Sequence, residues 1–321
     1  MKRRTFCGVL AAFPLSAISQ PRLYRVAWVT AERRDSPSSS LEALRSGLRD
    51  LNYVEGRDLV MDVWPGDGSG ERIEAMSGEI LASRPDVIVA AGGLPLFALL
   101  RAKVTTPIVF SMSGDPVEAK IVESFGRPGG TITGISLFAL DLVGKRLEYV
   151  KELLPAAKRV AVVANPQHPG ERLELTAAKE AASRLGLAVR YFPVTSKATL
   201  GAALVDIAKA RDDALLAFAD GFTLQFAGQI AEFSRRERIP AVDGWAPFAE
   251  AGNLMIYGPV ISDVYRRLAV YVDKIRKGAK PADLPVERPT KVELVINEAV
   301  ARQLGIVIPP AVLARADQRI R

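Results

Sequence analysis

The chain of 321 residues contains a single cysteine, Cys7, and a single histidine, His168. A zinc site built from cysteine and histidine needs about four such side chains, so that class of metal site is excluded. A Ser-His-Asp or Cys-His catalytic centre would have to rely on His168 alone. Much of the chemistry of hydrolases and metalloenzymes is therefore excluded, or lacks the residues that it requires.

Low-complexity and membrane-spanning segments are also missing. Hydrophobic residues make up 49% of the chain and charged residues 25%, which is enough apolar material for a folded core. The 25 glycines and 21 prolines are spread along the chain, which excludes a collagen-like protein. After the first twenty residues no apolar run is long enough to cross a bilayer, so stable membrane insertion is not expected. At roughly 100–200 residues per domain, the length predicts two domains.

A strong excess of one charge sign is absent as well. The formal net charge is +7, and it falls to +4 without Lys2, Arg3 and Arg4, which belong to a segment that we expect to be removed. The remaining basic residues alternate with acidic ones, as at 32–35 and 235–238. This pattern is typical of a solvated helix face, so no nucleic acid partner is expected.

The first twenty residues have the pattern of a secretion signal. A positive segment at 2–4 precedes an apolar stretch at 6–18, and small residues stand at the −3 and −1 positions of a cut before Gln20. We therefore expect residues 1–19 to be a signal peptide and the mature protein to be periplasmic. Residues 3–6 also fit the twin-arginine pattern, so the Sec and twin-arginine routes both remain open.

After this signal, short β-rich runs alternate with longer amphipathic runs in two successive series. Strands are expected at 24–30, 58–63, 87–91, 107–110, 131–137, 159–164, 188–194, 214–218, 240–242, 254–258 and 292–297, and helices at 41–51, 71–83, 96–102, 171–185, 200–210, 224–236, 261–277 and 298–304. This order predicts an α/β fold with two doubly wound parallel-sheet lobes.

Breaks in the pattern suggest how the two lobes are connected. Glycines and prolines cluster at 126–130, and three prolines fall within 281–289. Together with the placement of the strands, they predict a hinge that the chain crosses three times. We expect lobe 1 to comprise residues 20–137 plus 258–285, and lobe 2 to comprise residues 138–257 plus 286–321.

Ligands of open parallel sheets bind beyond the carboxyl ends of the strands, near helix N-termini. Five turns of small or polar residues follow predicted strands here, and each is expected to precede a helix. Turns such as Asn165-Pro166 also occur simply as helix caps, but five that converge on one cleft predict a ligand site. The candidate ligand-binding residues are Gly92, Gly93, Leu94, Ser113, Gly114, Asp115, Asn165, Asp220, Asp243 and Trp245.

The chemistry of these turns suits a small ligand that carries both charges. Asp115 and Asp220 are candidates to hold an ammonium group. Ser113 and the free N–H groups at Gly92–Gly93 and Gly114 are candidates to hold a carboxylate.

Aromatic residues near the same turns offer an apolar wall, with Trp245, Phe222 and Phe97 as candidates. The Gly92–Gly93 pair lacks the spacing of a dinucleotide loop or a P-loop, so no nucleotide cofactor is expected. His168 lies between prolines, and we expect it in an exposed loop at a helix start, without a catalytic role.

Long stretches of the chain resemble one family of known proteins. The segments at 53–59, 114–136, 144–166 and 248–317 are similar to those of ABC transporter substrate-binding proteins of the tryptophan/tyrosine type, which have a type I periplasmic-binding fold. This resemblance implies two lobes that close on a small ligand and then dock on an ABC permease with its ATPase. The chain departs from the family pattern at 92–97, where the usual hydroxyl residue is missing, and at 220–222, where the usual proline is missing.

The expected function is therefore that of an exported solute-binding protein of an ABC-type importer, without catalysis or cofactor. Its ligand would be small and polar or amino-acid-like. One alternative is a ligand-sensing module for a membrane receptor. Another is an enzyme on the same scaffold, with Asp115 or Asp220 as acid or base. A repressor of similar fold is disfavoured by the export signal and by the lack of an N-terminal helix-turn-helix.

Overall fold

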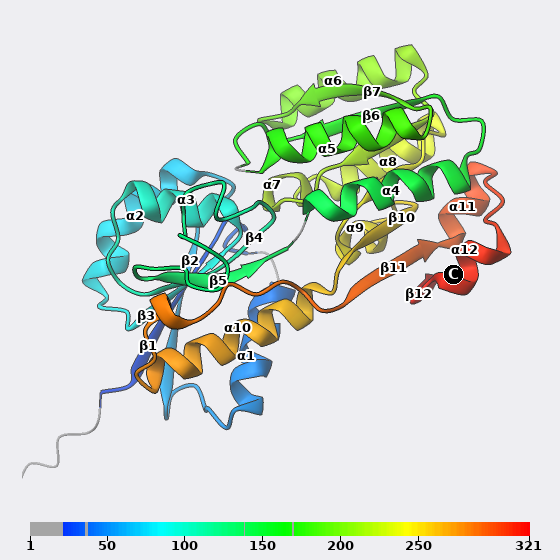
Figure 1. The fold of residues 1–321 in the computed structure, drawn as a ribbon. Coiled ribbons are helices and arrows are strands. Elements are labelled where there is room, and N and C mark those ends of the chain that lie inside the picture. The colour runs from blue at the N-terminus through cyan, green and yellow to red at the C-terminus, as the bar shows by residue number, and fades with distance from the viewer. Residues whose placement is uncertain (1–21, 36–37, 138, 169) are drawn as a thin grey trace, which may run out of the picture.

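The computed structural model describes residues 22–35, 38–137, 139–168 and 170–321. They form two α/β lobes that lie side by side, with the chain passing repeatedly between them (Figure 1). The predicted signal peptide at 1–19 lies outside the described residues.

Lobe 1 is built on a five-stranded parallel sheet in the order β2-β1-β3-β4-β5. Helices α1 and α10 cover one face of it, and α2 and α3 cover the other (Figure 1). The central strands are buried on both faces, which explains their continuous apolar sequence. The strands are β1 (Tyr24–Thr30), β2 (Leu59–Pro65), β3 (Val87–Ala91), β4 (Ile108–Met112) and β5 (Ile132–Ser136), and the helices are α1 (Ser39–Asp50), α2 (Gly70–Ala82), α3 (Gly93–Arg101) and α10 (Ile261–Arg276).

Lobe 2 is built on a seven-stranded sheet in the order β12-β11-β10-β9-β8-β6-β7. All neighbouring strands are parallel except β10 and β11, which run antiparallel because the chain visits lobe 1 between them. The strands are β6 (Arg159–Ala164), β7 (Ala188–Pro193), β8 (Ala214–Ala217), β9 (Ala241–Asp243), β10 (Met255–Pro259), β11 (Val292–Asn297) and β12 (Gln318–Ile320).

The helices of lobe 2 also cover both faces of its sheet. One apolar core lies under α4, α5, α11 and α12, and a second lies under α6, α8 and α9. Their bounds are α4 (Ala139–Leu153), α5 (Glu171–Arg184), α6 (Lys197–Ala210), α7 (Gly221–Leu224), α8 (Ala227–Glu237), α9 (Ala246–Glu250), α11 (Glu298–Leu304) and α12 (Pro310–Arg315), and a 3₁₀ turn, η1, spans Pro281–Asp283.

The three connections between the lobes lie next to one another. Ser136 N donates to Glu287 O at 3.0 Å, and Val260 N donates to Lys291 O at 3.3 Å. The connections enter the lobes about two residues from where the sequence placed them. Residues 258–259, expected in lobe 1, complete β10 of lobe 2, and Val286, expected in lobe 2, packs in a core of lobe 1.

Several elements differ from the sequence-based expectation. The helix expected at 224–236 is two helices, α7 and α8, because the capping box of Asp220 and Thr223 starts a helix earlier and a tight turn ends it at Leu224. No helix follows the turn at 113–116, and residues 113–131 form turns instead. Asn165-Pro166 does not cap a helix directly either, since α5 begins at Glu171.

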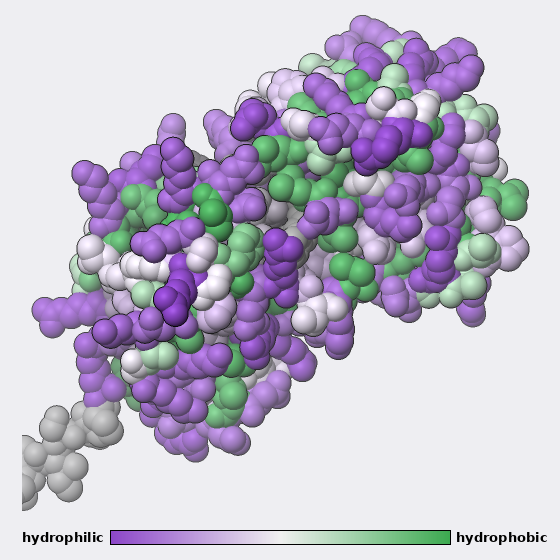
Figure 2. All heavy atoms as spheres, viewed as in Figure 1, coloured by the Kyte–Doolittle hydropathy of each residue, from purple (hydrophilic) through white to green (hydrophobic). Residues whose placement is uncertain are grey.

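The surface seen in Figure 2 is mostly hydrophilic, with smaller hydrophobic areas between the charged and polar residues. None of the helices in the described part of the chain has the length and apolar character needed to cross a membrane. The apolar residues are instead concentrated in the cores on the two faces of each sheet.

Candidate functional site

A cavity of about 260 Å³ lies between the lobes, at the carboxyl ends of strands from both sheets. Lobe 1 contributes the ends of β1, β3 and β4 and the first turns of α1, α3 and α10. Lobe 2 contributes the ends of β6, β8 and β9. Its lining residues are Thr30, Glu32, Ser39, Ser40, Ala91, Gly92, Gly93, Leu94, Pro95, Ser111, Met112, Ser113, Leu137, Asn165, His168, Asp220, Gly221, Phe222, Leu224, Trp245, Ala246, Pro247, Glu250, Ile261, Ser262, Tyr265 and Glu293.

The structure brings most of the candidate residues from the sequence to this cavity. Those that line it lie within three residues of the end of a strand, and they are Gly92, Gly93, Leu94, Ser113, Asn165, Asp220 and Trp245. The rule that ligands bind beyond the carboxyl ends of parallel strands therefore locates this cleft from both lobes.

Four other candidates do not line the cavity. The Asp115 carboxylate folds back onto its own turn, where Oδ1 accepts from the N–H groups of Val117 and Glu118. Gly114 packs against the backbone of lobe 2 instead of facing the cavity. Phe97 packs against the core of lobe 1. Asp243 is fully buried behind the cavity wall, so it is not available to a ligand.

Other lining residues were missed by sequence reasoning. Glu32 and Ser39 follow the end of β1, so the rule that identified the other turns also applies to them. Tyr265 comes from α10, about 235 positions after β1, and only the return of the chain to lobe 1 places it there. Its hydroxyl accepts from Ser111 Oγ at 3.0 Å.

The wall formed by lobe 1 contains the N-terminus of α3. Gly92 is the N-cap, and its φ of 104° favours glycine at this sharp turn from strand to helix. The N–H groups of Gly93 and Leu94 have no acceptor within the helix, as in the first turn of any helix. They are hydrogen-bond donors at the positive end of a helix dipole, which suits an anionic or carbonyl oxygen.

The wall formed by lobe 2 contains two side chains with unused polar atoms. Asp220 is only 6% exposed, and its Oδ1 accepts from Thr223 N at 2.5 Å and from Thr223 Oγ1 at 2.9 Å. Asn165 is 5% exposed, and its Oδ1 accepts from Gln167 N at 3.0 Å. No residue in the described part of the chain bonds to Asp220 Oδ2 or to Asn165 Nδ2. Lobe 2 thus offers a ligand one carboxylate acceptor and one amide donor.

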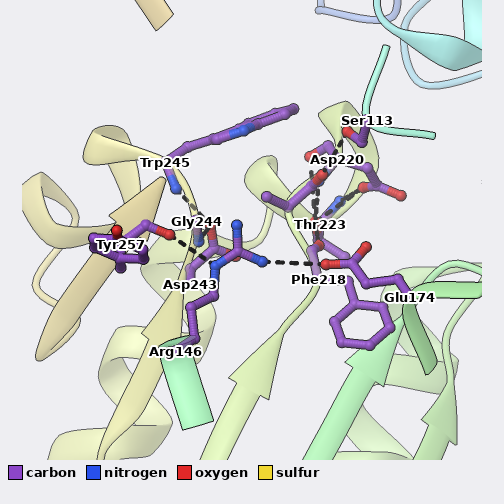
Figure 3. A network of polar contacts seen from close by, with 11 residues as sticks. Ser113, Arg146, Glu174, Phe218, Asp220, Thr223, Asp243, Gly244, Trp245 and Tyr257 are labelled. Carbon is purple, nitrogen blue, oxygen red and sulfur yellow. Dashed lines mark hydrogen bonds and ion pairs between the residues drawn. The ribbon is translucent and has the colours of Figure 1, made fainter. Parts of the chain in front are cut away.

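A buried ion pair lies behind this wall (Figure 3). Arg146 of α4 is 1% exposed, its Nε donates to Tyr257 O at 2.8 Å, and it pairs with Glu174 of α5 at 3.1 Å. Burial raises the pKa of Glu174 to about 7, although Arg146 opposes this shift. Burial likewise raises the pKa of Asp243, which accepts hydrogen bonds from Gly244 N and Trp245 N.

His168 is a half-buried residue of the cavity wall, and the expectation of an exposed loop is wrong. Its Nδ1 accepts from Gly170 N at 3.3 Å, which leaves its other ring nitrogen as the site of the proton. Burial lowers the pKa of His168, while Asp220 and Glu171 act in the opposite direction. The imidazole is therefore mainly neutral near pH 7.

Apolar side chains complete the cavity. The Trp245 indole extends away from Arg146 in Figure 3, and it packs against an apolar core of lobe 1 although its backbone belongs to lobe 2. Phe222 contacts Phe226 with ring centroids 5.1 Å apart. Among the described residues no group of three or more His, Cys, Asp or Glu side chains is arranged to hold a metal ion. The cavity thus combines a few directed polar atoms with an aromatic wall, which suits the binding of a small molecule.

Comparisons with known proteins agree with this geometry. A family model described as ABC transporter substrate binding protein matches residues 29–320. The tyrosine-binding protein of Clostridioides difficile is 22% identical over 271 residues, which are 83% of this chain and 78% of that protein. A conserved domain protein of Vibrio cholerae has a TM-score of 0.87 at 28% identity, and a Streptococcus pneumoniae ABC domain in complex with L-Trp has a TM-score of 0.85 at 22% identity. Both matches cover 93% of this chain and 100% of the other.

Proposed function

We propose, because the chain belongs to the ABC transporter substrate binding protein family, that it captures an aromatic amino acid and presents it to a membrane transporter. The family consists of binding proteins and not of enzymes, so the acid–base role considered for Asp115 or Asp220 is set aside. The two lobes would move as the two bodies of a clamshell, one built on the sheet β1–β5 and the other on the sheet β6–β12.

One observation carries the choice of ligand. The free Oδ2 of the buried Asp220 shares its cavity with the N-terminus of α3 and with the Trp245 indole. An α-amino acid would place its ammonium at Asp220, its carboxylate at the N–H groups of Gly93 and Leu94, and its ring against Trp245. The names of relatives that bind tyrosine or hold L-Trp support the same class of ligand.

Calorimetric titration of residues 20–321 with L-Trp and L-Tyr tests this proposal. Asp220→Asn keeps the oxygen that caps α7 and removes the charge, and charged hydrogen bonds contribute about 1.5–3 kcal/mol. We expect this variant to lose about 10- to 100-fold in affinity while its melting temperature changes little. Asp206→Asn, at an exposed position in α6, is the control and should bind like the wild type. Absence of binding to either amino acid would contradict the proposal.

The ABC-importer role and the export to the periplasm belong to the same proposal. We expect the mature protein in the periplasmic fraction with Gln20 as its first residue, and replacement of Arg3 and Arg4 by lysine should block export only if the twin-arginine route is used. Deletion of the gene should abolish uptake of the labelled amino acid. Normal uptake combined with a lost cellular response would instead favour the ligand-sensing module.

A further inference from the structure

The buried charges of lobe 2 do not balance. Five carboxyl groups of this lobe are each no more than 8% exposed, namely those of Glu171, Glu174, Asp212, Asp220 and Asp243. Asp212 pairs with Arg190 at 2.5 Å, whereas the other four form a cluster around Glu174. Arg146 is the only lysine or arginine that is buried among the described residues. Buried carboxylates need a counter-charge or a proton, because transfer of a charge out of water is costly.

The hydrogen bonds of this cluster are incomplete as well. Glu171 Oε1 and Asp243 Oδ2 are buried and have no hydrogen-bond partner among the described residues. The other titratable neighbours supply no full positive charge: His168 has its pKa lowered by burial, and Tyr191 of β7, beside Glu171, has its pKa raised by burial. The cluster therefore holds more carboxyl groups than Arg146 can neutralise.

The cavity itself does not supply a positive charge. None of the described residues that line it is a lysine or an arginine, whereas Glu32, Glu250 and Glu293 line it in addition to Asp220. Burial raises the pKa of Glu32 and of Glu293, and the nearby Asp317, Glu250 and Asp263 raise that of Glu293 further. A cation entering the cavity would meet a negative potential from both lobes.

We propose that the ligand's ammonium group is the missing counter-ion of this buried cluster, so that the site selects aromatic primary amines, with or without a carboxylate, and releases a proton as the ligand binds. This inference rests on the proposed function, and it names the positive charge as the part of the ligand that the site requires. Asp220 is the contact point, because its Oδ2 is the free oxygen of the cluster that lines the cavity.

The site would bind the ammonium group of an amino acid more strongly than its carboxylate. The ammonium would meet the buried carboxyl group of Asp220, with the further carboxyl groups of the cluster behind it. The carboxylate would meet only main-chain N–H groups at α3 and neutral side chains such as Asn165. The acidic residues that line the cavity would attract the ammonium and repel the ligand's carboxylate. Loss of the ammonium should therefore cost more affinity than loss of the carboxylate.

The released proton comes from the cluster and passes to the buffer. Glu174 is partly protonated near pH 7, and the nearby Asp220 carboxylate contributes to its raised pKa. An ammonium at Asp220 would cancel that repulsion and lower the pKa of Glu174, so the Glu174 carboxyl would lose its proton. Each pH unit by which that pKa falls corresponds to tenfold in affinity between low and high pH.

The first experiment compares three probes of one ring system, namely L-Trp, tryptamine and indole-3-propionate, by calorimetry on the mature protein at pH 7. We expect tryptamine to bind within about tenfold of L-Trp, and indole-3-propionate to bind at least 100-fold more weakly. Binding of L-Trp without binding of tryptamine would overturn the inference and leave the proposed function intact. If neither L-Trp nor L-Tyr binds, the proposed function fails, and tryptamine binding then decides the inference by itself.

The second experiment measures the proton directly, by repeating the titration in phosphate and in Tris buffer, whose ionisation enthalpies differ. We expect a fraction of a proton to be released for each ligand bound at pH 7. Glu174→Gln should reduce this release while retaining ligand binding. Glu148→Gln, at an exposed position of α4, should leave it unchanged. Equal apparent enthalpies of wild-type binding in the two buffers would overturn the proton coupling.

Discussion

Gly114 of lobe 1 touches Gly170 of lobe 2 beside the ligand cavity. A Cβ on Gly170 would lie 2.7 Å from the Cα of Gly114, and a Cβ on Gly114 would lie 3.1 Å from the Cα of Gly170. The neighbouring Ser113 Oγ donates to Ala219 O at 3.2 Å, so the two lobes also share a hydrogen bond at this point. The approach of the lobes therefore depends on the absence of side chains at both glycines.

Gly170→Ala should hinder this approach without disturbing either lobe. The φ of Gly170 is −104°, which alanine adopts readily, so the cost falls on the contact between the lobes. We expect roughly tenfold weaker ligand binding and a bound form that is less compact than the wild type in small-angle X-ray scattering. Gly201→Ala, in a helix of lobe 2 with open space around it, is the control and should bind normally. A variant that binds and closes like the wild type would contradict the role assigned to this contact.

Arg146→Met should strongly destabilise lobe 2. The substitution removes the hydrogen bond to Tyr257 O and leaves Glu174 buried without its partner. Breaking a buried ion pair on one side costs about 3–5 kcal/mol, and chemical denaturation at pH 7 would measure it. Lys145→Met, at the preceding residue of α4, removes an exposed pair with Glu148 and a contact of Nζ with the Tyr149 ring at 5.7 Å, and it should cost about 1 kcal/mol or less. Equal effects of the two variants would show that the buried pair does not stabilise the fold.

The strands could be predicted well where the signal is local. Val87–Ala91 is a short apolar run bounded by breakers, Val292–Asn297 follows the proline-rich break at 281–289, and the predicted bounds of both strands match the structure. The antiparallel direction of β11 could not be read locally, since it depends on the return of the chain from α10. The division into α7 and α8 depends on Asp220, whose side chain caps α7. This cap competes with the helical spacing of apolar residues over 224–236, which by itself predicts one helix.

The sequence could predict a site residue only where its position after the carboxyl end of a strand is enough to bring it to the cavity. Asp220 and Asp243 look alike in the sequence, because each follows a β-strand and precedes a helix. In the structure Asp220 lines the cavity, whereas Asp243 turns inward near Arg146, a residue from α4 almost a hundred positions earlier. No local pattern distinguishes these two fates. Tyr265 was missed for the same reason, since tertiary structure alone brings α10 to the cleft.

Trp245→Leu should weaken binding of an aromatic ligand. The indole lines the cavity and also packs against a core of lobe 1, so its loss removes both a ring contact and part of the contact between the lobes. Aromatic pairs contribute about 0.5–1.5 kcal/mol beyond the buried area, and we expect a 10- to 50-fold rise in Kd for L-Trp by calorimetry. Phe97→Leu, at an aromatic residue that does not line the cavity, should change Kd less than threefold. A larger effect of Phe97→Leu than of Trp245→Leu would place the aromatic contact elsewhere.

Glu174 should make the stability of the protein depend on pH. Its pKa is raised from 4.5 to about 7 in the folded state. The folded protein therefore binds this proton more tightly than the unfolded chain does, so the contribution is fully present below pH 4.5 and is lost as pH rises through 7. The size of the shift corresponds to about 3 kcal/mol.

We expect Glu174→Gln, which resembles the protonated carboxyl, to match the wild type in urea denaturation near pH 4.5. The variant should be the more stable of the two at pH 8. An equal difference between them at both pH values would contradict the raised pKa.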